Sequence, residues 1–525
     1  MAWKPLIAGL TLAAGAVIAV PASTAAAAGV RYEAETAPAV CTGTIDSNWA
    51  GFSGTGFCNG TNAVGAYAQF TVNAGTSGAA LAEVRFANGT TSNRPADVIV
   101  NGATVRSVSF EGTGAWTTWA TTTVTFTVPS GNSTIRFDPT TSAGLPNIDS
   151  IDFIWESPPP PGNTLYVATN GNDSGPGTLA APLRTIQRAV DLAQPGYTIF
   201  IRGGTYAPST NIQILKNGTS SQPITMRNYN GERVIIDGEN MPHTPDPPGG
   251  SIPRPERGAI HIEGDFWRLI GLEIIHGPYG VFGLDSSNNI YDRLVTRDNY
   301  ESGFHLFLSS SNNQILNLDS YGNRDPRNNG ESADGLAIKE GSGTGNVVRG
   351  ARLWNNSDDG LDYWMFSSPI LTENSLAWGN GFNRWNLPDF TGDGNGFKLG
   401  GNGVAANHTL RNSMTWDNAV SGIIDNNNPG QHRIERCTAW DNPGTGFDFD
   451  RSDSTLTANL AVANGTQVSL GSNSSGSGNS WDLGGSWSLV STDPSTITGP
   501  RAADGSIPSS TFLRPSNGAN VGARF

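Results

Sequence analysis

Three aspartates and one lysine recur at matching places in glycine-centred segments of the chain, where they could bind a metal ion and abstract a proton. The segments are Ala333–Leu336, Ser357–Asp362 and Asn395–Leu399. Aligned on their glycines, Asp334 and Asp359 precede the glycine by one residue, whereas Asp362 and Lys398 follow it by two. If each segment is one coil of a stacked β-structure, equivalent positions lie about 4.8 Å apart. The side chains would then share one patch of surface.

Crowded carboxylates of this kind indicate a cation site. Asp358 adds a fourth carboxylate beside Asp359, and carboxylates held close together raise one another's pKa. A hard cation with oxygen ligands, Ca²⁺ first among them, relieves that repulsion. The predicted metal ligands are Asp334, Asp358, Asp359 and Asp362. The alternative is that Asp-Gly pairs simply mark solvated turns.

Lys398 is the candidate base. Strand alternation after Gly396 points Phe397 and Leu399 one way and Lys398 the other, which puts Lys398 on the same face as Asp362 in the preceding coil. A bound cation would favour the neutral amine and lower its pKa from about 10.4. A neutral lysine can accept a proton. The alternative is that Lys398 is only a surface charge. Four other cations could line subsites for uronate groups or could likewise be surface charges: Lys339, Arg384, Arg411 and Arg433.

A repeat positions these residues. From about residue 260 onward, glycines followed by apolar alternation recur at intervals of 23 to 36 residues, at Gly280, Gly303, Gly335, Gly360, Gly396, Gly422 and Gly446. A repeat of this length indicates a solenoid. A predicted column of asparagines accompanies it, at Asn289, Asn313, Asn346, Asn374 and Asn407. The apolar face of residues 182–193 predicts an amphipathic helix that caps the open end. We therefore predict a right-handed parallel β-helix over residues 164–525.

The rest of the chain divides into three further parts. Residues 1–28 have the charged start, apolar run and small-residue end of a secretion signal. Residues 156–163 form a proline-rich spacer. Residues 29–155 alternate apolar and polar residues in short runs, which predicts an antiparallel β-sandwich. The prediction is thus an all-β protein that is exported, has no membrane anchor and is a monomer. Cys41 and Cys58 lie in the sandwich and could pair, which leaves Cys437 over.

The composition limits the partners. A net charge of −14 argues against nucleic acid. It also makes an anionic substrate difficult to bind unless a metal ion bridges the two.

Residues 164–525 resemble the family 9 polysaccharide lyases, a pectate lyase family with this β-helix fold. The matching motifs are Ala333–Gly335, Asn356–Asp362, Gly394–Gly401, Tyr166–Asp173 and Pro182–Ile186. The resemblance implies that Asp334, Asp358, Asp359 and Asp362 hold calcium and that Lys398 is the base. The reaction implied is β-elimination on polygalacturonate, in which Lys398 removes the C5 proton and a 4,5-unsaturated uronide forms. The implied partner is the acidic polysaccharide of plant cell walls.

The amino-terminal part resembles family 35 carbohydrate-binding modules. The matching motifs are Tyr32–Glu35, Gly51–Phe57, Arg85–Gly89, Asn93–Pro95 and Pro146–Phe153. The resemblance implies that Glu33, Glu35 and Asp152 bind a structural Ca²⁺, and that Arg94, Trp116 and Asn147 contact sugar. Linking such a module to an enzyme raises the local concentration of substrate.

Two alternatives to a calcium-dependent pectate lyase stay open. The first is a lyase or hydrolase that acts on another acidic polysaccharide, such as rhamnogalacturonan. The second is a β-helix protein that binds wall polymers without catalysis.

Overall fold

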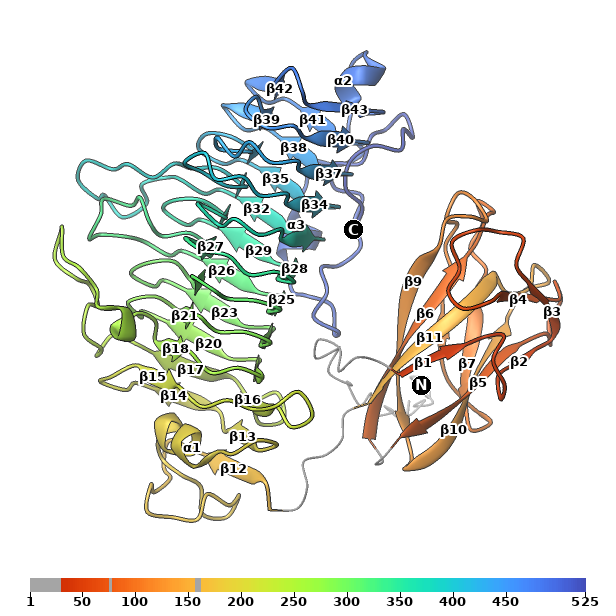
Figure 1. The fold of residues 1–525 in the computed structure, drawn as a ribbon, viewed down its shortest axis with the longest axis horizontal. Coiled ribbons are helices and arrows are strands. Elements are labelled where there is room, and N and C mark those ends of the chain that lie inside the picture. The colour runs from red at the N-terminus through yellow and green to blue at the C-terminus, as the bar shows by residue number, and fades with distance from the viewer. Residues whose placement is uncertain (1–29, 75–77, 156–161) are drawn as a thin grey trace, which may run out of the picture. The chain divides into compact units, whose positions relative to one another are not determined.

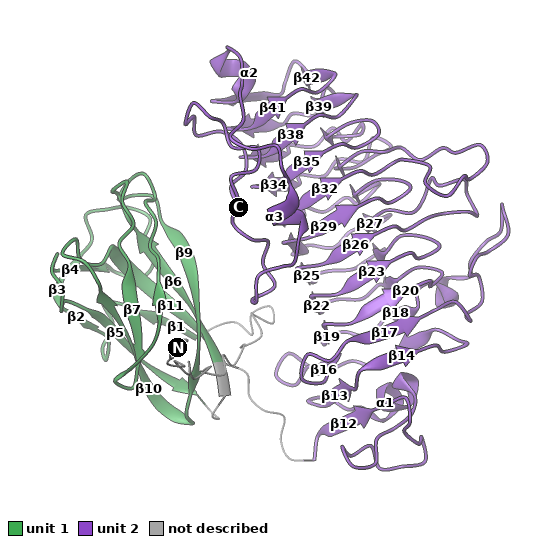
Figure 2. Cartoon of the chain, turned by 180° about the vertical axis from the view of Figure 1, so that it is seen from behind, with its two compact units in different colours: residues 1–158 green, residues 159–525 purple. Residues whose placement is uncertain are grey.

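The computed structural model describes residues 30–74, 78–155 and 162–525, so the predicted secretion signal and most of the spacer lie outside it. The chain divides into two compact units, of residues 1–158 and 159–525 (Figure 2). No helix in the described ranges has the length and apolar character needed to cross a membrane.

The first unit is a β-sandwich. Its described residues form two antiparallel sheets, in the orders β3-β4-β11-β6-β9, with β1 also pairing β11, and β2-β5-β10-β7-β8. The strands are β1 (Val30–Glu33), β2 (Val40–Cys41), β3 (Gly43–Asp46), β4 (Phe57–Gly60), β5 (Ala68–Ala74), β6 (Gly78–Ala87), β7 (Ala96–Val100), β8 (Ala103–Val108), β9 (Ala120–Val128), β10 (Gly131–Pro139) and β11 (Asn147–Trp155). Alternate residues of β5 and β10 are buried, and they include Phe70 and Phe137. The predicted sandwich is confirmed.

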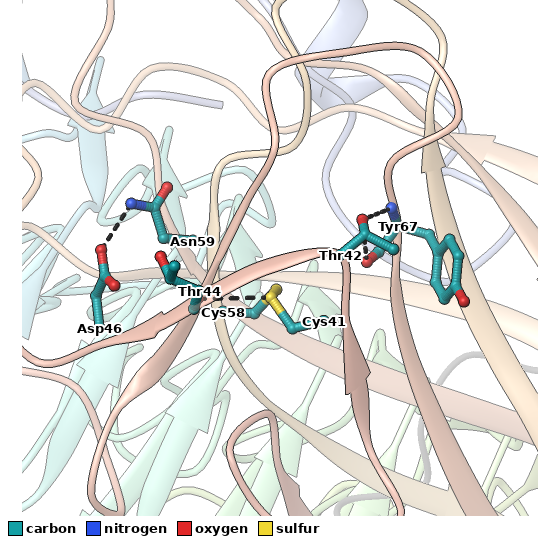
Figure 3. The surroundings of a disulfide bond; sticks show 7 residues. All are labelled: Cys41, Thr42, Thr44, Asp46, Cys58, Asn59 and Tyr67. Carbon is teal, nitrogen blue, oxygen red and sulfur yellow. Dashed lines mark hydrogen bonds between the residues drawn. A yellow bond between two sulfur atoms is a disulfide. The ribbon is translucent and has the colours of Figure 1, made fainter.

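A disulfide joins the two sheets of this unit near their edges. Cys41 of β2 and Cys58 of β4 are bonded, with 5.6 Å between their Cα atoms (Figure 3). Beside it, Asn59 Nδ2 donates to Asp46 Oδ2 at 2.7 Å and links β4 to β3. Cys437 is buried and unpaired. The open question of cysteine pairing is thus resolved in favour of Cys41 and Cys58.

The second unit is a right-handed parallel β-helix. Its described residues form three parallel sheets of twelve, ten and ten strands, in which each coil adds one strand to each sheet (Figure 1). The first sheet comprises β12 (Thr164–Val167), β13 (Thr198–Ile201), β16 (Ile224–Asn228), β19 (Trp267–Ile270), β22 (Ile290–Asp292), β25 (Gln314–Leu316), β28 (Val347–Arg349), β31 (Leu371–Glu373), β34 (Thr409–Arg411), β37 (Arg433–Glu435), β40 (Thr455–Thr457) and β43 (Ser475–Ser477). The second comprises β14 (Gly204–Tyr206), β17 (Val234–Asp237), β20 (Glu273–Ile275), β23 (Val295–Arg297), β26 (Asp319–Tyr321), β29 (Arg352–Trp354), β32 (Leu376–Trp378), β35 (Met414–Trp416), β38 (Thr438–Trp440) and β41 (Leu460–Val462). The third comprises β15 (Ile212–Ile214), β18 (Ile260–Ile262), β21 (Val281–Leu284), β24 (Phe304–Phe307), β27 (Leu336–Lys339), β30 (Leu361–Asp362), β33 (Phe397–Lys398), β36 (Ile423–Ile424), β39 (Thr445–Phe449) and β42 (Thr466–Leu470).

The third sheet has an apolar inner column and a polar outer column. The inner column pairs residues that are all fully buried: Phe304, Leu336, Leu361, Phe397, Ile423 and Phe447. The next position along each strand gives the outer column: His305, Ala337, Asp362, Lys398, Ile424 and Asp448. Because side chains alternate along a strand, the inner column fixes the register that stacks Asp362 beneath Lys398. The predicted shared face is confirmed.

The amphipathic helix is present but shorter than predicted. Helix α1 spans Ile186–Leu192, and Thr185 caps its first turn by accepting a hydrogen bond from Arg188 N. Leu183 instead bridges Val167 of β12, because its buried side chain joins the stack before the helix begins. The helix contacts β12, β13 and β15 at the first end of the stack (Figure 1). The other helical turns are η1 (Arg254–Glu256), α2 (Ser480–Leu483) and α3 (Ser495–Thr498).

Asparagine ladders hold the turns between coils. Of the predicted column, Asn289, Asn313 and Asn346 are linked from backbone N–H to side-chain oxygen at 3.0 Å each. Asn374 and Asn407 do not belong to it, because the equivalent positions in the next two coils are Ile370 and His408, and His408 Nδ1 accepts from Ile370 N. A longer ladder was not predicted. It joins Asn299, Asn323, Asn356, Asn380, Asn418, Asn442 and Asn464 in one chain of hydrogen bonds.

The longer ladder should be a main support of the coils around the acidic residues. Asn380 is buried; its Nδ2 donates to Asn418 Oδ1 at 2.9 Å and its Oδ1 accepts from Asn356 Nδ2 at 3.0 Å. We expect Asn380→Ala to lower the free energy of unfolding by about 3 kcal/mol, because each buried polar group left unpaired costs roughly 1–3 kcal/mol. Denaturant unfolding would measure this. Asn520→Ala is the matched control, since Asn520 is exposed and makes one side-chain bond, to Arg436. Equal stabilities of the two variants would contradict the role of the ladder.

Candidate active site

Three of the predicted metal ligands converge where successive coils enter the third sheet. Asp334 lies two residues before β27, and Asp358 and Asp359 lie just before β30. One carboxylate oxygen from each falls within 4.8 Å of the others. All three residues are buried. The turns that start these two strands therefore place three acids around a single point, which is the geometry of a cation site.

Each of these acids is held in a way that leaves an oxygen for a ligand. Asp358 Oδ1 accepts from Asp393 N at 2.7 Å. Asp359 Oδ1 accepts from the backbone and side-chain nitrogens of Asn395, at 2.7 and 2.9 Å. Asp334 Oδ1 is buried and accepts no hydrogen bond from any described residue. A buried carboxylate oxygen normally has a partner, so this site fits a hard cation that takes oxygen ligands.

Asp362, the fourth predicted ligand, lies at the edge of the cluster between two lysines. Its Oδ2 is 2.6 Å from Lys339 Nζ and 3.3 Å from Lys398 Nζ. Lys339 also contacts Asp334 Oδ2, at 2.8 Å. Lys339 was predicted to be a surface charge or a subsite residue, but it is largely buried within the cluster. Alternation along β27 could have found it, because Lys339 follows Ala337 by two residues and so shares the outer face.

Lys398 lies against the acids as the alignment predicted. Its Nζ is 3.0 Å from Asp359 Oδ2 and 2.7 Å from Asp393 Oδ2, and its side chain is only 7% exposed. Burial alone would lower the pKa of Lys398, but the carboxylates of Asp359, Asp362, Asp358 and Asp393 outweigh it and raise the pKa well above its usual value. Without a further positive charge the amine is protonated.

The cluster carries excess negative charge. The four buried carboxylates and two ammonium groups have a formal net charge of −2, and the exposed carboxylate of Asp393 adds a further negative charge beside Lys398. Burial, partly offset by Lys339 and reinforced by neighbouring acids, raises the pKa of Asp334 to about 7. Burial and then Asp359 raise the pKa of Asp358 well above its usual value. The two lysines outweigh burial only at Asp362, whose pKa is lowered. A divalent cation would cancel the excess.

A cavity of about 420 Å³ opens beside the cluster. Asp358, Asp362, Asp393 and Lys398 line one part of it, and Arg257, His305 and Phe307 line another. Its walls come from β24, β27, β30 and β33, so it runs across successive coils of the third sheet. A linear polymer could lie along such a cavity. The remaining cations of the sequence analysis are not among its lining residues: Arg411 pairs with Glu373, Arg433 pairs with Glu435, and Arg384 lies over the Phe382 ring.

In the first unit, Glu33 and Ser53 lie close to Asp149, an aspartate that the sequence did not predict as a ligand. Ser53 Oγ donates to Glu33 Oε2 at 2.8 Å and also lies 3.1 Å from Asp149 Oδ2, and Thr55 N donates to Glu35 Oε1 at 2.7 Å. Asp149 and Glu35 contribute, after burial, to the raised pKa of Glu33. Asp152 instead forms an ion pair with Arg31, its register partner on β1. Asp149 is likewise paired, with Arg85 Nη1, so the ion pairs do not separate the two aspartates, and Asp152 stays a predicted ligand.

The predicted sugar-contacting residues lie partly together. The Arg94 guanidinium is 5.4 Å from the centre of the Trp116 ring, and Arg94 Nη1 donates to Leu145 O at 2.8 Å. Asn147, two residues further on, is buried, and its Nδ2 has no partner among the residues that the structure describes. Trp116 is half-buried, so part of its ring stays accessible.

The second unit is similar in sequence and fold to polysaccharide lyases. Residues 165–459 match the family model described as "Pel9A-like, right handed beta helix region". Pectate lyase PEL9 of Emericella nidulans is 50% identical over 384 residues, which are 68% of this chain and 94% of that protein. The crystal structure of pectate lyase Pel9A is 32% identical with a TM-score of 0.60, and the match covers 69% of this chain and 91% of that one. A solved rhamnogalacturonan lyase is 26% identical with a TM-score of 0.60, over 68% of this chain and 97% of its own.

The first unit matches carbohydrate-binding modules. Residues 33–154 match the model described as "Carbohydrate binding module (family 6)". A solved family 35 module of Cellvibrio japonicus is 38% identical and covers 25% of this chain and 94% of its own, with a TM-score of 0.24 over the present chain.

Proposed function

The chain belongs to the Pel9A-like right-handed β-helix family and is a polysaccharide lyase, and from that premise we propose that it cleaves polygalacturonate by calcium-dependent β-elimination. The observation that carries the proposal is the contact between Lys398 and a buried acidic cluster that has two negative charges in excess. That arrangement provides a base directly beside a cation site.

Residues of the chain can bind the cation and accept the proton that the reaction removes. Ca²⁺ bound by Asp334, Asp358, Asp359 and Asp362 would supply charge that neutralises a substrate carboxylate, acidifies the adjacent C5 proton and favours the neutral form of Lys398. Lys398 Nζ accepts the C5 proton. The electron pair of that C–H bond forms the C4–C5 double bond as the bond from C4 to the glycosidic oxygen breaks. The leaving oxygen takes up a proton from water, Lys398 returns the C5 proton to the solvent, and the products are a 4,5-unsaturated uronide and a shortened chain.

The test is an assay for the conjugated product. Polygalacturonate would be incubated with the full chain, with Ca²⁺ or with a chelator, and the ultraviolet absorbance of the unsaturated uronide followed. We expect a rise that needs Ca²⁺. New reducing ends without this absorbance would mean hydrolysis and would contradict the proposal. Unsaturated product from rhamnogalacturonan alone would favour the second candidate, which the similarity to a solved rhamnogalacturonan lyase supports.

We further propose that the first unit binds wall polysaccharide and that the protein is secreted. The match to a carbohydrate-binding module and the grouping of Arg94 with Trp116 support the first part. The signal-like residues 1–28 and the disulfide support the second. Retention of the chain on insoluble pectin, measured with and without Trp116→Ala, tests the binding role. Equal retention would exclude Trp116 as the stacking residue.

A further inference from the structure

The cavity beside the acidic cluster extends beyond the residues that the reaction uses. In the outer column of the third sheet, His305 pairs with Ala337, Ala337 with Asp362 and Asp362 with Lys398. His305 is thus three strands from Lys398, or about 14 Å at the usual spacing of strands in a sheet. Both residues line the same cavity. A ligand that reaches from the base to His305 must therefore be longer than the groups that react.

His305 is a buried polar side chain without a partner. It is 7% exposed, and neither ring nitrogen has a hydrogen-bond partner in the described part of the chain. Burial, followed by the charges of Lys339 and Arg257, keeps the pKa of His305 well below its usual value. The neutral ring offers one donor and one acceptor. Because buried polar groups are nearly always paired, its place on the cavity wall indicates a ligand with hydroxyl or carboxylate groups.

Arg257 provides a positive charge at the same end of the cavity. No described carboxylate forms an ion pair with its guanidinium, which donates through Nε to Ile252 O at 3.2 Å. The Arg257 guanidinium carbon lies 5.5 Å from the centre of the Phe282 ring and 5.8 Å from the centre of the Phe307 ring. The other cations lining the cavity are paired with acids: Arg327 with Glu301, Lys339 with Asp334 and Asp362, and Lys398 with Asp359 and Asp393. Arg257 is therefore available to a carboxylate from outside the chain, with which guanidinium forms paired hydrogen bonds.

Aromatic rings complete this end of the cavity. The His305 ring lies 5.0 Å from Phe282, 5.6 Å from Phe307 and 5.6 Å from Tyr279, centre to centre. Tyr279 and Phe307 line the cavity together with Arg257 and His305. Such a wall can pack against the C–H face of a sugar while polar groups bind its hydroxyls.

We propose that Arg257 and His305, with Phe307 beneath them, form a distal subsite for one uronate unit of the polymer, remote from the bond that is cleaved. Arg257 binds the carboxylate of that unit and His305 binds a hydroxyl. The inference rests on the proposed function for the identity of the polymer. The subsite would favour chains in which the unit at this position is acidic over chains in which it is a neutral sugar.

The test compares substrates of increasing length. We expect Arg257→Gln to lower kcat/KM on polygalacturonate and long oligogalacturonates by tenfold or more, and to leave the shortest cleaved oligomers unchanged, because those do not reach the subsite. Arg257→Lys should recover part of the loss. Arg254→Gln is the matched control: Arg254 lies on the same turn, also over the Phe307 ring, but is exposed and is not one of the residues lining the cavity. Thermal unfolding of each variant checks the fold.

Two outcomes would overturn the subsite. An equal loss on short and long substrates would place Arg257 at the reacting centre, and no loss on any substrate would mean that it binds none. A binding measurement separates this inference from the proposed reaction. Titration of hexagalacturonate into Lys398→Met and into the Lys398→Met, Arg257→Gln double variant, both with Ca²⁺, should show weaker binding in the second. Weaker binding would uphold the subsite even if the wild-type chain formed no unsaturated product, and equal binding would overturn it.

Discussion

Lys398→Met should lower kcat on polygalacturonate by about 10³-fold, within the 10²–10⁴-fold range typical of general bases. Methionine keeps the unbranched apolar stem of the side chain but lacks the terminal amine and cannot accept the proton. It also removes the contacts of Nζ with Asp359 and Asp393, at 3.0 and 2.7 Å, which leaves the acids with more negative charge. The affinity for Ca²⁺ should therefore be retained or increased. Initial rates of formation of the unsaturated product, together with calorimetric titration of Ca²⁺, measure the two effects separately.

Lys339→Met is the control that the structure supplies, because Lys339 is also a largely buried lysine that contacts two acids of the cluster, Asp334 and Asp362. Its Nζ is compensated by Asp334 and Asp362, and we expect its loss to lower the rate much less than the loss of Lys398. If Lys339→Met abolished the reaction while Lys398→Met stayed active, the base would be Lys339 and the alignment on glycines would have selected the wrong lysine.

The dependence of the rate on pH should report the same residue. The pKa of Lys398 is raised by the surrounding carboxylates, and only the neutral amine can accept the C5 proton. Below that pKa the neutral fraction grows tenfold for each pH unit, so kcat should rise with pH and level off on the alkaline side. Lys398→Met should lose this rise. Because bound Ca²⁺ opposes the carboxylates, the plateau should begin at a lower pH than the raised pKa alone would suggest.

The sequence predicted the parts of the molecule that follow from local periodicity. Alternation alone places Phe397 inward and Lys398 outward, and parallel stacking then puts Lys398 above Asp362, as the register shows. The asparagine column was predicted to run through Asn374 and Asn407 but is confirmed only as far as Asn346, because a ladder needs every coil to keep the same turn, and Ile370 and His408 take the equivalent positions in the next two coils. The longer ladder through Asn356 was missed although its first members, Asn299, Asn323 and Asn356, have the same spacing as Asn289, Asn313 and Asn346.

The side-chain contacts that the sequence did not predict are ion pairs between distant segments of the chain. Lys339 and Asp393 reach the cluster from a strand end and from a long loop, and no spacing rule says which charged side chain folds back onto a site. In the sandwich, Asp149 and Asp152 are three residues apart. A register shift in β11 between Ile148 and Ser150 changes the course of the strand beside Asp149. Antiparallel pairing of β1 with β11 places Asp152 opposite Arg31, with which it forms an ion pair. Such irregularities arise from pairing with distant strands, which the local pattern does not record.

Asp358→Asn should weaken Ca²⁺ binding by about 100-fold while making the calcium-free protein more stable. Asp358 is buried among like charges, and an uncompensated buried carboxylate opposes folding. Asparagine keeps the oxygen that accepts from Asp393 N at 2.7 Å but removes one charge from the cation site. Thermal unfolding in chelator should therefore give the variant the higher Tm. Adding Ca²⁺ should reverse the order, because a ligand at 100 times its Kd contributes about 2.7 kcal/mol of stability.

Asp448→Asn is the matched control for that reversal, since Asp448 lies in the same outer column two strands beyond Lys398 and outside the three-acid cluster. Its Ca²⁺ affinity and its gain in Tm on adding Ca²⁺ should equal those of the wild type. Activity of Asp358→Asn should return at high Ca²⁺, because Lys398 is intact and the cation needs only to be present. If Asp358→Asn instead kept full Ca²⁺ affinity but lost its activity, Asp358 would act on the substrate rather than on the cation. The negative charge of the cluster would then not be explained by a bound metal ion.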